Sequence, residues 1–174
     1  MACNITAGRA LPNCKNVGGL KSILVMNYDS GMELNITLDA NDVVTNFGSA
    51  NYQLYNFEVR GANTMDETNE QSVENGTTFW SAAGSLQLHV QDSVSRKTLE
   101  IMAKGRPHIF TLDWNGVYKL YGDINGCEVT VNTNSGAGMG DFNGYTVSIA
   151  STEDHLAYFV DSTIIDDSIN TTVN

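Results

Sequence analysis

The sequence predicts a mainly β fold: an antiparallel β-sandwich or half-barrel of about nine strands with one flanking α-helix at about 93–104. Segments in which apolar and polar residues alternate recur along the chain, and this period of two is typical of half-buried strands. Clusters of Gly, Asn and Asp separate these segments, as expected for tight turns. One segment, 93–104, repeats its apolar residues with a helical period instead. Strands in runs with a single helix favour a sandwich or barrel over an α/β fold.

The N-terminal half is expected to begin with an arm and then form strands. Residues 1–20 are rich in Gly and Asn and lack any period, which indicates an extended arm. The expected strands follow in the order 22–27, 33–38, 43–47, 51–60 and 77–90. Residues 61–76 interrupt this pattern and end on Asn75-Gly76, so we expect a long loop there.

This acidic stretch, 61–76, contains no Lys or Arg and has two readings. It is either a solvated loop or a segment that becomes ordered by docking on a neighbouring subunit. The candidates for such an inter-subunit contact are Asp66, Glu67, Glu70 and Glu74. Their expected counterparts in another copy are Arg96, Lys97 and Arg106.

The single helix has start and stop signals. Asp92 is placed to accept N–H groups of the first turn, and Lys104 suits the negative C-terminal end. Gly105 is expected in the left-handed conformation that ends a helix. The apolar stripe predicted to face the core consists of Val94, Thr98, Ile101 and Met102.

The pattern Asp-x-Asn-Gly occurs three times, at 113–116, 123–126 and 141–144. Asn-Gly accepts positive φ at both central positions of a type I′ turn, so each copy predicts a hairpin whose Asp binds turn N–H groups. A calcium loop is excluded because the residues after Asp123 and Asn125 do not continue the ligand series. The strands expected in this region are 108–112, 117–121, 127–131, 145–151 and 156–160.

Composition limits the class of protein. The 174 residues predict an arm at 1–20, a single β-domain at 21–165 and an acidic polar tail at 166–174. The net charge of −11 and the pI of about 4.4 argue against a basic patch for duplex DNA or anionic lipid. No run has the length of a membrane span, so no membrane association is expected.

Motifs that carry chemistry are missing from the sequence. Cys3, Cys14 and Cys127 have neither disulfide nor zinc spacing and indicate reduced thiols. The glycine cluster 136–140 lacks the spacing and the following helix of a nucleotide-binding loop. We therefore expect no catalytic residue, no cofactor and no metal site, and hence not an enzyme. A hydrolase with a carboxylate pair is the weakest alternative, because nothing in the sequence selects a pair.

From Tyr52 onward, the order of features resembles the small tail tube proteins of tailed bacteriophages. A long alternating strand at 53–60 leads into an acidic stretch that ends Glu74-Asn75-Gly76-Thr77-Thr78-Phe79. A strand and a helix follow, ending Ala103-Lys104-Gly105-Arg106-Pro107-His108. Next come Asn125-Gly126-Cys127-Glu128-Val129-Thr130, a Gly-rich linker and Gly140-Asp141-Phe142-Asn143-Gly144-Tyr145-Thr146-Val147. The opening Met1-Ala2-Cys3-Asn4-Ile5-Thr6-Ala7-Gly8-Arg9 is similar to the start of other phage virion proteins.

The resemblance implies a structural protein of the virion tail that is assembled in the host cytoplasm. Six copies would form a ring by edge-to-edge strand pairing, and stacked rings would form a conduit for the genome. The implied partners are other copies of the chain, the tape-measure protein, the tail terminator, baseplate proteins and, in a contractile tail, a sheath. DNA would be met only in transit through the lumen, and no active-site residue carries over.

Polar strand faces predict the surface that would line such a tube. The candidates for the lumen face are Glu128, Thr130, Thr146 and Ser148. An acidic lumen would repel phosphates, so DNA would slide without sticking.

Two alternatives stay open from the sequence. One is another tail or baseplate component of the same fold. The other is a carbohydrate-binding β-sandwich module, whose aromatic platform would come from Trp80, Trp114 and Tyr118.

Overall fold

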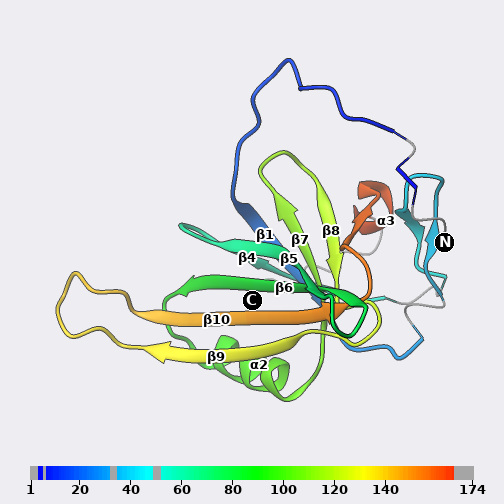
Figure 1. Ribbon diagram of the computed structural model, residues 1–174. Helices are drawn as coiled ribbons and strands as arrows, with labels where there is room; N and C mark the ends of the chain where they lie inside the picture. The colour runs from blue at the N-terminus through cyan, green and yellow to red at the C-terminus, as the bar shows by residue number, and fades with distance from the viewer. Residues whose placement is uncertain (1–3, 6, 32–34, 49–51, 167–174) are drawn as a thin grey trace.

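The computed structural model describes residues 4–5, 7–31, 35–48 and 52–166, which form two β-sheets with helices beside them (Figure 1). The first sheet has seven strands in the order β2-β3-β11-β8-β7-β1-β4, and the second has four in the order β5-β6-β10-β9. The seven strands are β1 Leu20–Met26, β2 Thr37–Leu38, β3 Val43–Asn46, β4 Leu54–Glu58, β7 His108–Asp113, β8 Tyr118–Tyr121 and β11 Tyr158–Val160. The four are β5 Thr64–Ser72, β6 Thr77–His89, β9 Glu128–Asn134 and β10 Gly144–Glu153. The described helices are α2 Ser93–Lys104 and α3 Ser162–Asp166. The predicted mainly β sandwich with a flanking helix is confirmed.

The core lies on both sides of the seven-stranded sheet. On β1, Ile23 and Val25 belong to a cluster between the two sheets. Leu24 and Met26 belong to a second cluster on the opposite side. Because both faces of β1 are buried at its C-terminal end, residues 23–26 are a continuous apolar run rather than an alternation.

The bounds predicted for the helix are confirmed, but two details of it are wrong. Asp92 Oδ1 accepts the N–H groups of Val94 and Ser95 at 2.9 and 2.8 Å, as expected of an N-cap. Gly105 is extended rather than left-handed, with φ −98°. The buried residues of α2 are Leu99 and Met102, whereas Val94 and Ile101 of the predicted stripe are exposed. The buried face of α2 differs from the predicted stripe because packing against β9 decides which residues are buried. The mixed sequence of the helix does not define one apolar face clearly enough to predict it.

The loop predicted at 61–76 is wrong, because Thr64–Ser72 is strand β5. It pairs with β6 without a register shift, from Thr64 opposite Ser85 to Ser72 opposite Thr77. Only the tip of this hairpin, 73–76, is a turn. β5 has few apolar residues because one of its faces is exposed, so the alternation on which strand prediction depends is weak.

The three Asp-x-Asn-Gly segments have three different structures. The first is the predicted hairpin turn between β7 and β8, where Asp113 Oδ1 accepts the N–H groups of Asn115 and Val117, both at 2.8 Å. The hairpin predicted for the second segment, at 123–126, is wrong. This segment carries the chain from β8 in one sheet to β9 in the other. The N–H of Cys127 bonds to Pro107 O at 2.8 Å, which holds this crossover against the segment after α2.

The third segment, at 141–144, is also not a simple hairpin turn. Asp141 Oδ2 accepts the N–H groups of Ala137 and Gly138 at 2.9 and 2.7 Å, so it orders the glycine-rich connection before it. Gly144 is the first residue of β10, and an added Cβ there would collide with Leu88 O of β6. The glycine is needed because two strands approach closely.

The ends of the chain are described only in part. The described residues of the arm are exposed before β1, and Asn115 Nδ2 bonds to Val17 O at 2.7 Å where the arm meets the β7–β8 turn. Residues 33–34 of the predicted strand 33–38 lie outside the described residues, and β2 covers only its end. Of the predicted tail, 167–174 lie outside them as well.

Candidate functional site

The outward side of the four-stranded sheet is an array of small polar side chains, here called the polar face. Along β10, buried and more exposed residues alternate, as expected when one face of a strand is covered. Ser148 lies opposite Ser85 of β6 and Thr130 of β9, so one face runs across these strands. Its members are Thr64, Asp66, Thr68, Glu70 and Ser72 of β5, Thr77, Phe79, Ser81, Ala83, Ser85, Gln87 and His89 of β6, Thr146, Ser148, Ala150 and Thr152 of β10, and Glu128, Thr130 and Asn132 of β9. Phe79, opposite Glu70 and 40% exposed, is the one large apolar side chain among them.

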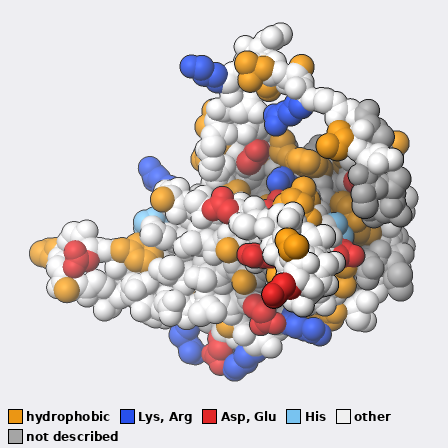
Figure 2. Space-filling view, viewed as in Figure 1, with side chains coloured by type: hydrophobic (Ala, Val, Ile, Leu, Met, Phe, Trp, Pro, Cys, Tyr) orange, Lys and Arg blue, Asp and Glu red, His pale blue; other side chains and the backbone are white. Residues whose placement is uncertain are grey.

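The polar face is acidic and has no basic side chain of Lys or Arg. Its ionised groups are Asp66 and Glu70 at one edge and Glu128 at the other. No Lys or Arg occurs in any of the four strands. Figure 2 shows mainly white atoms over β9 and β10, with blue Lys and Arg atoms below them where α2 lies. Negative charge therefore meets no compensating charge on this surface.

The structure brings all four predicted lumen-face residues together. Glu128 and Thr130 of β9 lie beside Thr146 and Ser148 of β10 on the polar face. The four predicted inter-subunit acids are separated instead. Asp66 and Glu70 share the polar face, Glu74 lies exposed in the β5–β6 turn, and Glu67 points inward.

The Glu67 carboxylate bonds to residues of its own chain and is not exposed for a contact with a neighbouring subunit. Its Oε1 accepts the N–H of Ala157 at 2.7 Å, and its Oε2 lies 3.1 Å from Lys119 Nζ. Two of the expected basic counterparts also have partners in the same chain. Arg96 lies 3.6 Å from a carboxylate oxygen of Glu100, and the Arg106 guanidinium lies 4.5 Å from the centre of the Tyr28 ring.

Neither edge of the four-stranded sheet pairs with a further strand within the described part of the chain, although α2 packs against β9. β5 pairs there only with β6, and β9 only with β10. β5 is nine residues long and is continuous in register. A long regular edge without Pro or Lys is a template for pairing with another strand. The polar face is therefore bounded by two strands that are able to continue it.

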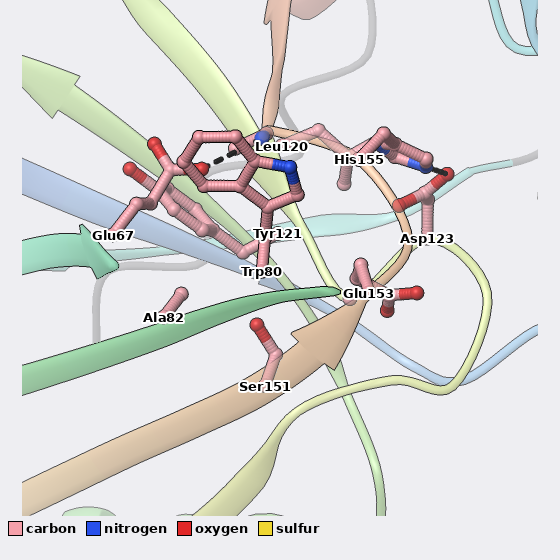
Figure 3. Close-up of a pocket in the computed structure, with 11 residues that line it drawn as sticks. Glu67, Trp80, Ala82, Leu120, Tyr121, Asp123, Ser151, Glu153 and His155 are labelled. Atoms are coloured by element: carbon pink, nitrogen blue, oxygen red, sulfur yellow. Dashed lines mark hydrogen bonds and ion pairs between the residues drawn. The ribbon is translucent and has the colours of Figure 1, made fainter. Parts of the chain in front are cut away.

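A second polar feature is buried between the sheets. Figure 3 shows Asp123, Glu153 and His155 grouped at one end of a small pocket, with Glu67 and Trp80 toward the other. Asp123 and Glu153 are 2% and 8% exposed. His155 Nε2 lies 3.2 Å from Asp123 Oδ2, an ion-pair distance. Asn125 N–H donates to Glu153 Oε1 at 3.3 Å.

The surroundings shift the protonation of this buried group. Burial, reinforced by the charge of Asp123, raises the pKa of Glu153 to about 7. The Asp123 carboxylate raises the pKa of His155 to about 9 despite the partial burial of the ring. The second ring nitrogen, Nδ1, lies 2.9 Å from Leu156 O, so both N–H groups of a charged imidazole face acceptors.

Sequence reasoning missed this group. Asp123 was expected to bond its own turn, and Glu153 and His155 belong to no motif. One signal was available, because the alternation of β10 places Ile149, Ser151 and Glu153 on the same inner face. A carboxylate at an inward position of a strand indicates a buried partner.

The aromatic residues do not form a common platform. Trp80 and Trp114 line separate hollows, and Trp114, on the β7–β8 turn, is 58% exposed. The hollow beside Trp114 is a broad groove of about 1050 Å³ that also contacts Asn56 and Arg60. Tyr118 is half-buried. Of the three residues predicted to form the platform, Trp114 alone is exposed.

Comparisons with protein-family models, with curated proteins and with solved structures found no match to this chain. Among the described residues, no three His, Cys, Asp or Glu side chains are arranged to hold a metal ion. No helix in the described part of the chain is long and apolar enough to cross a membrane.

Proposed function

We propose that this protein is a structural subunit of a phage tail tube, in which copies form rings whose inner wall is the polar face. The observation that carries the proposal is the combination of a polar, acidic face with an open strand edge on each side of it. A face of this kind is stable next to water, and open edges are stabilised when another copy pairs with them.

Strand direction supports ring closure through these edges. Each strand of the four-stranded sheet is antiparallel to its neighbours, so β5 and β9 run in opposite directions. Copies related by rotation would therefore bring β9 of one copy antiparallel to β5 of the next. The alternation would continue around the ring, and a closed barrel would have no free edge. The number of copies, six in the family that the sequence resembles, is part of the proposal.

The charge of the polar face suits a conduit. Asp66, Glu70 and Glu128 would face the lumen, where they repel the phosphates of DNA. Apart from Phe79 opposite Glu70, the side chains between them are mainly Ser, Thr and Ala, which offer little to hold a passing polymer. In this proposal the protein acts in the virion tail, with the tape-measure protein inside, terminator and baseplate proteins at its ends and, in a contractile tail, a sheath around it.

Cysteine cross-linking tests the proposed pairing. Thr68 on β5 and three positions on β9 lie on the polar face, so a disulfide between copies would join strands in the correct register. Thr68→Cys is combined in turn with Glu128→Cys, Thr130→Cys and Asn132→Cys. Cys3→Ser and Cys14→Ser remove the other two thiols; Cys14 is exposed, while Cys127 is buried.

One of the three pairs should yield a ladder of covalent oligomers that ends at the ring size on a non-reducing gel. Each single-cysteine variant should give no product beyond a dimer, because β5-to-β9 pairing needs one thiol from each strand. Negative-stain microscopy of the same sample, and of particles from cells, should show rings or tubes. Monomers at all concentrations and no ladder from any pair would contradict the proposal.

Two rivals are separated by other measurements. Another tail or baseplate component of the same fold would be present in few copies per particle, whereas a tube subunit is present in many. A carbohydrate-binding module would bind a glycan array, and Trp114→Ala would abolish that binding without changing the oligomeric state.

A further inference from the structure

The buried group of Asp123, Glu153 and His155, toward the right of Figure 3, lies where the chain passes between the two sheets. Asp123 is in the connection from β8 to β9, and His155 is in the connection from β10 to β11. Glu153 ends β10 in the four-stranded sheet. A contact among these three side chains therefore ties two crossovers of the sandwich together.

Two oxygens of this group are buried without a hydrogen-bond partner. They are Glu153 Oε2, which has no hydrogen-bond or ion-pair partner among the described residues, and Asp123 Oδ2, which has only the ion pair with His155 at 3.2 Å; both residues line the same pocket. The enclosed space is about 10 Å³, on the order of a single water molecule. A buried carboxylate oxygen without a donor is costly, so a proton or a bound water is needed to satisfy the pair.

The other charged groups around the pocket do not supply that proton or charge. Glu67 is matched by Lys119 at 3.1 Å. Asp154, exposed, adds a negative group 3.7 Å from His155 Nε2. Tyr121 and Cys127 keep their protons, because burial raises the pKa of both. His108 of β7 also interacts with Asp123, but burial lowers the pKa of its ring and favours the neutral form. The imidazolium of His155 is then the positive charge that faces the two buried carboxyl groups.

We propose that Asp123, Glu153 and His155 form a buried proton-binding site that locks the two crossovers together and weakens when its protons are lost. One proton lies on the carboxyl pair, chiefly on Glu153, and the other on His155. Loss of the first proton leaves two adjacent buried carboxylates, and loss of the second removes the positive charge between the crossovers. This site is independent of the proposed function.

The direction of the pH dependence follows from the two groups. Glu153 stabilises the fold fully below its ordinary pKa of 4.5, and this contribution is lost as pH rises through about 7. His155 contributes fully below 6.5, and its contribution is lost as pH rises through about 9. Both losses have the same sign, so the crossovers are held most firmly at mildly acidic pH.

Thermal unfolding at pH 5, 7 and 9 tests the site. We expect the Tm of the wild-type protein to fall by about 5–10 °C over this range. Glu153→Gln keeps the shape of a neutral carboxyl group and should abolish most of the decrease between pH 5 and 7. His89→Gln is the matched control, because His89 is an exposed imidazole on the polar face and should retain the wild-type profile. A Glu153→Gln profile identical to that of the wild type would overturn the proposal.

A second measurement tests the site in the wild-type protein, so it does not depend on whether a variant folds. NMR titration of the histidine rings in the wild-type protein should place the His155 pKa near 9, where the Asp123 carboxylate holds it. Asp123→Asn should lower the pKa of His155 below 7. A wild-type His155 that titrates below 7 would also overturn the proposal, because the imidazolium would then be absent at neutral pH.

Discussion

Replacement of Leu99 by Ala is the sharpest test of how α2 is docked. Leu99 is 1% exposed and belongs to the cluster between the sheets, which also contains Val129 of β9. A buried Leu→Ala change removes apolar contacts and leaves a cavity, which together cost about 3 kcal/mol in the free energy of unfolding. For a chain of this size, such a loss lowers the Tm by about 6–12 °C.

Urea unfolding followed by far-ultraviolet circular dichroism measures this loss as a lower midpoint with an unchanged slope. Ile101→Ala is the matched control, because Ile101 lies on the same helix and is 60% exposed. Its free energy of unfolding should change by less than about 0.5 kcal/mol, since Ala is also the better helix former. A larger loss from Ile101→Ala than from Leu99→Ala would refute this docking. The apolar stripe predicted from the sequence would then be the buried one.

Three further outcomes follow from the structure. Gly126→Ala should lower the free energy of unfolding by about 2 kcal/mol or more, measured by denaturant unfolding. The reason is that φ of Gly126 is +74° and an added Cβ would collide with Arg106 O. An unchanged free energy of unfolding would contradict the close approach of this crossover to Arg106. Asp92→Ala should cost about 1 kcal/mol, while Asp92→Asn should retain most of the cap, and equal losses would argue against capping by Oδ1. At pH 8, iodoacetamide should label exposed Cys14 and leave Cys127 unmodified by mass spectrometry, because burial raises the pKa of Cys127 to about 12. Fast labelling of Cys127 in the native protein would show that the core opens there.

Local sequence signals were sufficient where a segment is stabilised by its own neighbours. The bounds of α2 follow from Asp92 at its start and Gly105 after its end, and the first Asp-x-Asn-Gly segment forms its turn through Asp113. These contacts join residues only a few positions apart. The left-handed end expected at Gly105 was wrong because its extended backbone already donates to Ile101 O and Met102 O.

Segments stabilised by distant partners were predicted poorly. β5 is polar on one face and reads as a loop, yet its ladder to β6 makes it a strand. The segment 123–126 has the same Asp-x-Asn-Gly pattern as 113–116 and 141–144, but the chain passes into the other sheet there. Asp123 then lies beside His155, which no local pattern indicates.

The sequence by itself determined the mainly β class, the position of the helix and the excess of negative charge, because each depends on residue type and short-range periodicity. It also identified Glu128, Thr130, Thr146 and Ser148 as outward residues of their strands, since alternation alone separates the two faces of a strand. Only the tertiary structure decided that β9 and β10 are neighbours and that their polar sides form one surface with Asp66 and Glu70. Only the structure brought Glu153 to Asp123, because strand order and burial arise from the packing of the whole chain and not from any one segment.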